Sequence, residues 1–234
     1  MNKKSIIKNI IPFIFIFLFF GCTHINEFAR FNLTGKNIMM KQYVSPDLAR
    51  VNVDINGSYY DDNFISIILA GIGGSIAESS VREKVMNAVN ADSLVYQISL
   101  GIEDGLETYF SANIVETLEE NPQFIAETRF ERFRIASNTS GIYAMIDTRV
   151  LITDRHSAKT VWENTECASI PIGDVIYDFT CNRYVRTAKG VINAVRLMQM
   201  SEEEIRAAVN IAAGEAGKRQ CDMLREDIAN KYDY

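Results

Sequence analysis

The stretch that decides the fold is Phe124–Cys167, FIAETRFERFRIASNTSGIYAMIDTRVLITDRHSAKTVWENTEC. Residues 124–135, 142–152 and 160–167 are three strand-like runs: the first is rich in aromatic residues and arginine, and the second carries apolar side chains at alternate positions, which is the period of a half-buried β-strand. Turn-forming residues separate these runs, at Asn138–Gly141 and at Asp154–Ala158. Because short turns join antiparallel neighbours, the stretch predicts a three-stranded antiparallel meander.

Charged residues occupy the positions of the meander that face away from the apolar side. Arg129, Glu131, Asp147 and Arg149 are expected on exposed faces or opposite one another. They allow two interpretations, a charged docking face or an ordinary solvated sheet surface, and we favour the second.

The residues before the meander predict one strand and two helices. Arg50–Tyr59 alternates as a strand does, and the capping box formed by Ser80 and Glu83 starts a helix that reaches about Asn90. A second helix is indicated over 98–110, although its two glycines, Gly101 and Gly105, each lower helix propensity by ~1 kcal/mol.

The residues after the meander are also predicted to be helical. A short apolar face spans 185–195, and a second capping box, Ser201 with Glu204, starts a longer helix. Its apolar stripe consists of Ile205, Val209, Ala212, Ala216, Met223 and Ile228. We therefore predict an α+β fold, with an antiparallel meander sheet packed against helices in a single domain.

The amino terminus has the pattern of a secretory signal. Lys3, Lys4 and Lys8 precede an apolar run over 10–20, which is too short to cross a bilayer. The sequence Phe19-Phe20-Gly21-Cys22 then resembles the lipobox of bacterial lipoproteins. This resemblance implies cleavage before Cys22 and acylation of that cysteine, with membrane attachment through the lipid.

Cleavage would divide the chain into a signal peptide at 1–21, a polar tether at 22–47 and a periplasmic domain at 48–234. The net charge of -6 would become -9, because residues 1–21 contain three lysines and no acid. An acidic body gains no attraction from an anionic bilayer, so attachment would depend on the lipid. In the lipoprotein family, a residue other than aspartate at the position of Thr23 favours the outer membrane.

Three cysteines remain beside the acylated one. Cys167 and Cys181 flank an apparent loop and are the preferred disulfide pair in an oxidising periplasm, which would add roughly 3 kcal/mol of stability. Pairs that involve Cys221, or no bridge at all, remain open.

One apolar segment, Phe64–Ile76, is distinctive because it contains three glycines and almost no polar residue. The simplest interpretation is a buried strand or helix that leads into a tight turn. The functional alternative is a partner or membrane contact, made by Phe64, Ile65, Ile67, Ile68, Leu69 and Ile72.

Motifs for catalysis, metal binding and cofactor binding are absent from the sequence, including GxSxG, the Walker loop, HExxH and CxxC. Of the two histidines, His24 lies beside the predicted lipid and His156 lies in a predicted turn. The acidic charge balance also argues against a nucleic-acid partner. We therefore expect no enzyme, no metal and no cofactor.

A weaker resemblance extends over Phe124–Glu163, where an alternating strand meets Ile142–Ile152, the turn Asp154–Lys159 and then Thr160–Glu163. This order is similar to periplasmic auxiliary lipoproteins of ABC-type transporters and to the TolB-amino-terminal-like group. The resemblance implies a non-catalytic accessory or scaffold of a cell-envelope assembly, with an envelope protein as partner. The alternative is a protein that binds a lipidic or small hydrophobic ligand.

Overall fold

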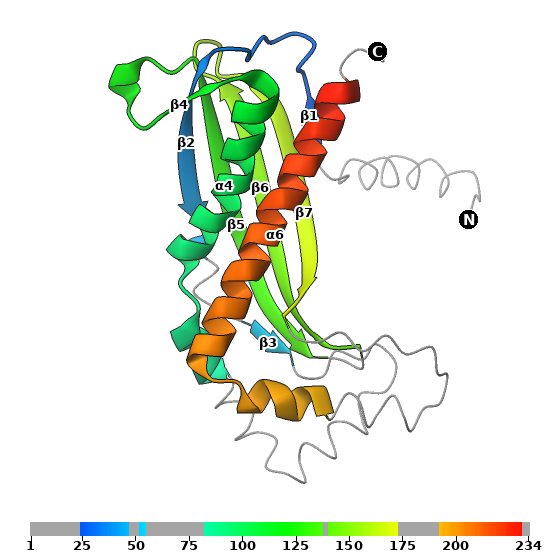
Figure 1. The fold of residues 1–234 in the computed structure, drawn as a ribbon. Helices are drawn as coiled ribbons and strands as arrows, with labels where there is room; N and C mark the ends of the chain where they lie inside the picture. Colours follow the sequence, from blue (N-terminus) through cyan, green and yellow to red (C-terminus); the bar gives the residue numbers. More distant parts are fainter. Residues whose placement is uncertain (1–23, 47–51, 55–81, 138–139, 173–191, 231–234) are drawn as a thin grey trace, which may run out of the picture.

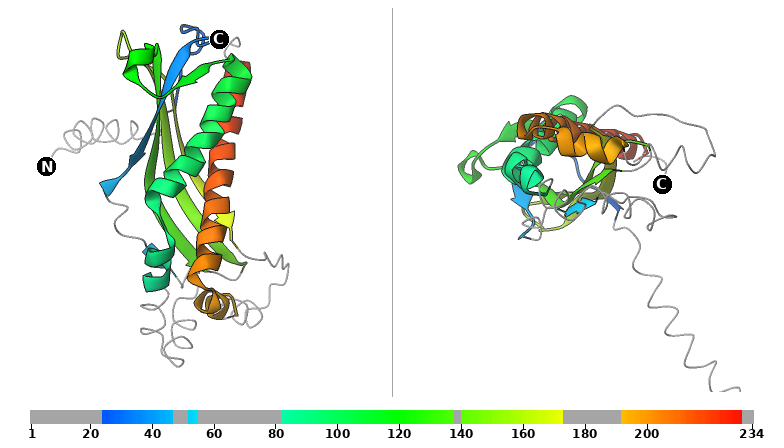
Figure 2. Two further views of the ribbon diagram at one scale, coloured as in Figure 1. Left: turned by 60° about the vertical axis from the view of Figure 1, so that its left-hand side comes forward. Right: turned by 90° about the horizontal axis from the view of Figure 1, so that it is seen from below.

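The computed structural model describes residues 24–46, 52–54, 82–137, 140–172 and 192–230 (Figure 1). Within these residues, seven strands form one mixed sheet, and helices pack against one face of it (Figure 2). The predicted α+β class and the single domain are confirmed. The elements are β1 (Ile25–Asn26), β2 (Asn37–Val44), β3 (Asn52–Asp54), α4 (Ala91–Phe110), β4 (Asn113–Val115), η2 (Leu118–Glu120), β5 (Phe124–Ser137), β6 (Ile142–Asp154), β7 (Thr160–Pro171) and α6 (Glu202–Ala229).

The predicted meander forms the centre of the sheet. β5 pairs antiparallel with β6, and β6 pairs antiparallel with β7. Each strand extends a few residues further than the alternating pattern predicted, so that β7 ends at Pro171. The alternation is also confirmed, because every second residue of β6 from Ile142 to Ile152 is buried.

The sequence did not predict how the strands outside the meander pair with the sheet. The sheet order is β1-β7-β6-β5-β2-β4, and β3 pairs with β5 beyond the end of β2. β2, β3 and β4 all lie parallel to their neighbours. β2 ends opposite Phe130, β3 begins opposite Arg134, and the register of β5 shifts between Phe130 and Arg132. A bulge of this kind increases the local twist of a strand.

The predicted tether is wrong for the part that the structure describes. Residues 24–46 contain β1 and β2, and they bury Phe28, Leu33, Ile38 and Met39 in the core. These apolar residues are spaced by five, five and one positions, which matches neither the strand period nor the helix period. The segment belongs to the domain because the sheet, α4 and α6 provide the surfaces that bury it.

The predicted helices are largely confirmed. Residues 82–88 and 192–199 are helical, and Ser201 and Glu204 form the expected capping box at the start of α6. The predicted apolar stripe of α6 is confirmed, because its first four residues are buried and Met223 and Ile228 are partly buried against the cluster around Trp162. The structure adds Gln220, Leu224 and Asp227 as buried positions near the end of the helix.

The core consists of two apolar clusters. One contains Phe130, Phe133 and Ile146, and the other surrounds Trp162 with Ile102 and Leu224. Between the two clusters, each of the three meander strands and each of the two long helices contributes one buried polar side chain. These are Thr128 of β5, Thr148 of β6, Asn164 of β7, Gln220 of α6 and Ser99 of α4.

The two long helices approach closely because glycines face each other. A Cβ atom on Gly101 of α4 would lie 2.4 Å from the Gly217 carbonyl carbon of α6, and one on Gly217 would lie 2.6 Å from the Ile98 carbonyl oxygen. At Gly105, the space of the missing side chain is filled by Cys221 and Leu224. The glycines that weaken α4 as an isolated helix therefore permit its packing against α6.

Two glycines of α6 allow a test of this contact. A Cβ on Gly214 would meet nothing within 4 Å, whereas a Cβ on Gly217 would overlap the α4 backbone. We expect Gly214→Ala to stabilise the domain by ~1 kcal/mol through helix propensity. We expect Gly217→Ala to destabilise it by about 1–3 kcal/mol through overpacking.

Both variants are to be measured by chemical denaturation of the domain, with thermal unfolding as a check. The chemical change is the same and the positions are three residues apart in one helix, so each variant controls for the other. Equal effects of the two substitutions would contradict the close helix contact.

Candidate functional site

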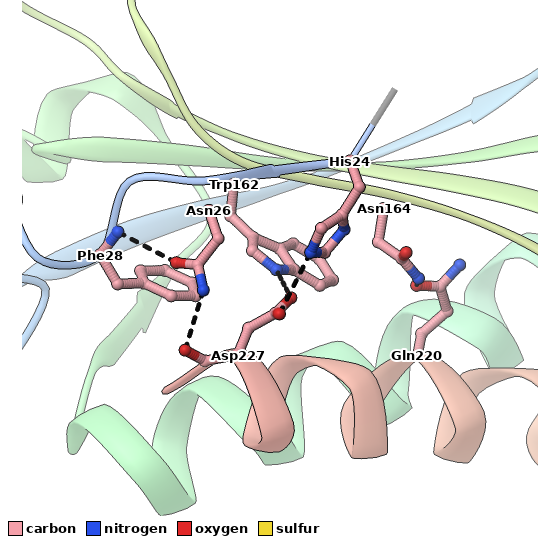
Figure 3. A network of polar contacts seen from close by, with 7 residues as sticks. All are labelled: His24, Asn26, Phe28, Trp162, Asn164, Gln220 and Asp227. Atoms are coloured by element: carbon pink, nitrogen blue, oxygen red, sulfur yellow. Dashed lines mark hydrogen bonds and ion pairs between the residues drawn. The ribbon is translucent and has the colours of Figure 1, made fainter. Parts of the chain in front are cut away.

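The structure holds His24 and Asn26 against the end of α6 (Figure 3). His24 Nε2 lies 3.1 Å from Asp227 Oδ1, and the Asn26 side-chain amide donates to the Asp227 carbonyl oxygen at 2.9 Å. The other carboxylate oxygen, Asp227 Oδ2, accepts from Trp162 Nε1 at 2.6 Å. Asp227 therefore joins the amino-terminal segment, β7 and α6 at one point, and we call these four residues and Phe28 the N-terminal clasp.

Aromatic packing completes the N-terminal clasp. The Phe28 ring stacks on Trp162 with a centroid distance of 6.4 Å and lies 5.2 Å from Phe110 at the end of α4. The Phe28 backbone N–H donates to Asn26 Oδ1, which fixes the turn that follows β1. Phe28 and Trp162 are both almost fully buried. The segment is thus held by apolar burial as well as by hydrogen bonds.

A second polar group lies next to the N-terminal clasp, in the layer between the two core clusters. The Asn164 amide donates to Gln220 Oε1 at 2.9 Å, and Gln220 Nε2 donates to Thr148 Oγ1 at 2.7 Å (Figure 3 shows Asn164 and Gln220). These bonds connect β6, β7 and α6. Buried polar groups cost free energy when they lack partners, so this chain of bonds fixes the register of α6 on the sheet.

Sequence reasoning missed the N-terminal clasp. The signals were the single tryptophan of the chain and an acid at a core-facing position of α6, since Asp227 follows Gln220 and Leu224 at helical spacing. An acid at such a position needs a buried partner. The sequence could not identify that partner, because Trp162 is 65 residues away and His24 is 203 residues away.

His156 lies where the sequence placed it, in the turn between β6 and β7. Asp154 Oδ1 accepts hydrogen bonds from the backbone N–H groups of His156 and Ser157 and from the Ser157 hydroxyl. The backbone bond from Ser157 is the largest cause that lowers the pKa of Asp154. Ala158 takes a positive φ of 54°, a conformation that glycine usually adopts. All three hydrogen bonds are accepted by the Oδ1 atom of Asp154, and they shape the turn.

On the sheet face opposite α4 and α6, three of the predicted charges pair with residues outside the predicted set, Asp147 for example with Arg132. Glu131 is half-buried on β5. Arg149 contacts Glu163, which is only 4% exposed, through both Nε and Nη2. Arg129 pairs with Glu127 and lies over the Tyr43 ring. These contacts within the sheet agree with the interpretation of the charges as an ordinary solvated sheet surface.

Other predicted site residues fall partly outside the structure. Cys22, Cys181 and the apolar contact residues Phe64, Ile65, Ile67, Ile68, Leu69 and Ile72 lie outside the described residues. Cys167 is exposed on β7 with a free thiol, and Cys221 is a free thiol packed beside Gly105. The disulfide between Cys167 and Cys181 stays a prediction.

Two further findings concern the described ranges alone. His, Cys, Asp and Glu side chains nowhere gather there in a group of three that could hold a metal ion. A helix long and apolar enough to cross a membrane is likewise not found there.

The N-terminal clasp predicts the effect of removing Asp227. Asp227→Ala would leave the buried Trp162 N–H without its acceptor, and we expect a loss of about 1–3 kcal/mol in unfolding free energy. The exposed neighbour Glu226 provides the control variant, Glu226→Ala, which should change stability by less than about 0.5 kcal/mol.

Guanidinium unfolding followed by the fluorescence of Trp162 measures both variants, and limited proteolysis reports whether residues 24–30 have become accessible. Equal stability and equal protease resistance of the two variants would show that Asp227 does not hold the segment.

The surroundings of Cys167 predict that its thiol reacts slowly with alkylating reagents, although the side chain is exposed. A hydrogen bond to Asp147, together with burial and the charges of Asp147 and Glu166, raises the pKa of Cys167 to about 11. At pH 8 only about one thiol in a thousand would be ionised, and the thiolate is the reactive form. Asp147→Asn should therefore accelerate alkylation of Cys167 by about tenfold for each pKa unit that is recovered.

Iodoacetamide labelling of the reduced protein, with peptide-resolved mass spectrometry, separates Cys167 from the other cysteines. Glu131→Gln removes a carboxylate from β5 and serves as the control. Similar labelling rates in the two variants would contradict the role of Asp147.

Comparison with known proteins identifies no family. No family model matches the sequence, and no curated protein matches it. Among solved structures, the chain is similar to protein XCC0632 of the DUF330 family from Xanthomonas campestris, with 10% identity over 85% of this chain and 90% of that chain, at a TM-score of 0.37. It is also similar to the PelC dodecamer from Paraburkholderia phytofirmans, with 9% identity over 74% and 90% of the two chains, at a TM-score of 0.29. Similarity at this level assigns the chain to no family.

Proposed function

We propose that this protein is a lipid-anchored periplasmic lipoprotein of the outer membrane, which acts as a non-catalytic accessory or scaffold for a cell-envelope assembly. The observation that carries the proposal is the sequence Phe19-Phe20-Gly21-Cys22, which lies immediately before the folded domain. The cationic start and the short apolar run before it have the physical pattern of a cleaved signal rather than of a membrane span.

The N-terminal clasp supports an anchored role. His24, two residues after the proposed acylation site, is already bound to Asp227, and Ile25 already pairs with β7. A domain attached so closely would stay at the membrane surface and would not extend far into the periplasm. Two or more acyl chains give stable attachment, whereas one chain binds only marginally.

The polar side chains of the described residues support a role in contacts. His24 and Asp227 connect segments of the fold, Asp154 shapes the turn that contains His156, and Arg149 and Glu163 neutralise each other. Each of these groups has a structural partner. The alternative, a binder of lipidic ligands, depended on Phe64–Ile76, which lies outside the described residues.

The anchor is tested by replacing the proposed acylated residue. In cells fed labelled palmitate, the wild-type protein should incorporate label and sediment with the outer membrane. Cys22→Ala should lose the label and leave the membrane fraction, because no other part of the proposal attaches the domain to lipid. Cys167→Ser, which alters an exposed thiol, is the control and should behave as the wild type does.

The accessory role is tested with the same strains after crosslinking in intact cells. A defined envelope protein should be crosslinked to the wild type in stoichiometric amount and lost from Cys22→Ala. Membrane association of Cys22→Ala would contradict the anchor, and co-purification of a lipid without any crosslinked protein would contradict the accessory role.

A further inference from the structure

The position of β1 determines where a lipid anchor would leave the domain. This inference depends on the acylation of Cys22 that is proposed above. Two peptide units separate Cys22 from His24, which is a span of at most about 7 Å. His24 is fixed by Asp227, and Ile25 pairs with Glu163 of β7. The anchor would therefore leave at the β1–β7 edge of the sheet, beside α6.

The two edges of the sheet are far apart. β1 and β7 lie at one end of the strand order, whereas β2 and β4 lie at the other. Figure 1 shows α6 over the β7 side and α4 over the β2 side. The side chains agree with this arrangement, because Arg219 of α6 approaches Glu166 of β7 and Gln42 of β2 donates to Ser99 of α4. A membrane that holds one edge is thus distant from the other.

Acidic and basic residues are also distributed differently between the α4 side and the α6 side of the domain. Residues 91–120, which form α4, β4 and η2, contain seven acids and no lysine or arginine. Residues 214–229 of α6 contain three bases and four acids, and several of these form ion pairs, such as Lys218 with Glu215 and Arg225 with Asp222. β7 adds two acids, Glu163 and Glu166, which approach Arg149 and Arg219. An anionic bilayer therefore repels residues 91–120 more strongly than it repels the side formed by β7 and this part of α6.

The position of the anchor and the distribution of charge favour the same orientation of the domain on the bilayer. We propose that the side of the domain formed by β1, β7 and the carboxy-terminal half of α6 lies against the phospholipid bilayer, with α4, β4 and η2 directed away from it. The short connection from Cys22 to the N-terminal clasp holds the domain in this orientation. The acidic residues 91–120 then face the periplasm.

Site-specific photocrosslinking to lipid tests the orientation. Benzoylphenylalanine is placed at Arg219 or Glu226, which lie on exposed parts of α6 toward β7, or at Glu107, which is exposed on α4. The acylated full-length protein is reconstituted in vesicles of phosphatidylethanolamine and phosphatidylglycerol and irradiated. We expect lipid adducts to be several-fold more abundant at Arg219 and Glu226 than at Glu107.

A longer connection provides the matched control. A flexible Gly/Ser insert of about twelve residues between Thr23 and His24 adds a reach of roughly 20 Å. It should leave membrane binding unchanged and make the adduct yields at the three positions similar. An unchanged preference for Arg219 and Glu226 in this variant would show that the short connection does not orient the domain.

Failure of the orientation is distinguishable from failure of the anchor. Palmitate incorporation and vesicle binding are measured on the same preparations. An acylated, vesicle-bound protein with equal adducts at all three positions, or with more adducts at Glu107, would overturn the orientation while the anchor stands. A protein without acyl chains that does not bind vesicles would overturn both.

Discussion

The close approach of α4 and α6 at Gly101 and Gly217 is the constraint on which the rest of the structure depends. Helices usually pack with their axes 8–10 Å apart, and a contact without side chains permits the shortest of these distances. Because the two helices are held together as one layer, their inward-facing residues cover one face of the meander over its full length. The entropy that glycine loses in a helix is the cost of this arrangement.

The polar layer in the core gives that helix pair a fixed position on the sheet. An entirely apolar interface would tolerate a shift of α6 by one turn, since alanines and leucines would still be buried. The bonds from Gln220 to Asn164 and Thr148 prevent such a shift, because a displaced Gln220 would leave three buried polar groups without partners. The same register places Asp227 opposite Trp162, and so creates the N-terminal clasp.

The N-terminal clasp connects the fold to the proposed function. A lipoprotein on a long tether can sample many orientations, whereas a chain bound by Asp227 two residues after the proposed acylation site would not. The less acidic side of the molecule lies beside the clasp, and the acidic residues of α4 and η2 lie toward the β2–β4 edge. In the proposed arrangement the lipid attaches the domain, and the contacts near the end of α6 orient it.

The sequence by itself determined the elements whose causes are local. Three strand-like runs separated by turn residues over Phe124–Cys167 determined the meander, the Ser201 and Glu204 capping box determined the start of α6, and the turn at Asp154 was evident from its residue types. Such features depend on neighbours within a few positions, so they can be read along the chain. The lipobox-like pattern over Phe19–Cys22 is likewise short and continuous, and the acylation that it predicts stays a proposal.

Only the tertiary structure decided what depends on distant partners. The parallel pairing of β2 on β5, the inclusion of residues 24–46 in the core and the contacts of Asp227 all join segments separated by many residues. Gly101 and Gly105 look unfavourable in the sequence of α4 because their benefit comes from Gly217 and Cys221, more than a hundred residues later. The physical reason is that burial and close packing are properties of two surfaces in contact, and a linear sequence specifies each surface without showing which two will meet.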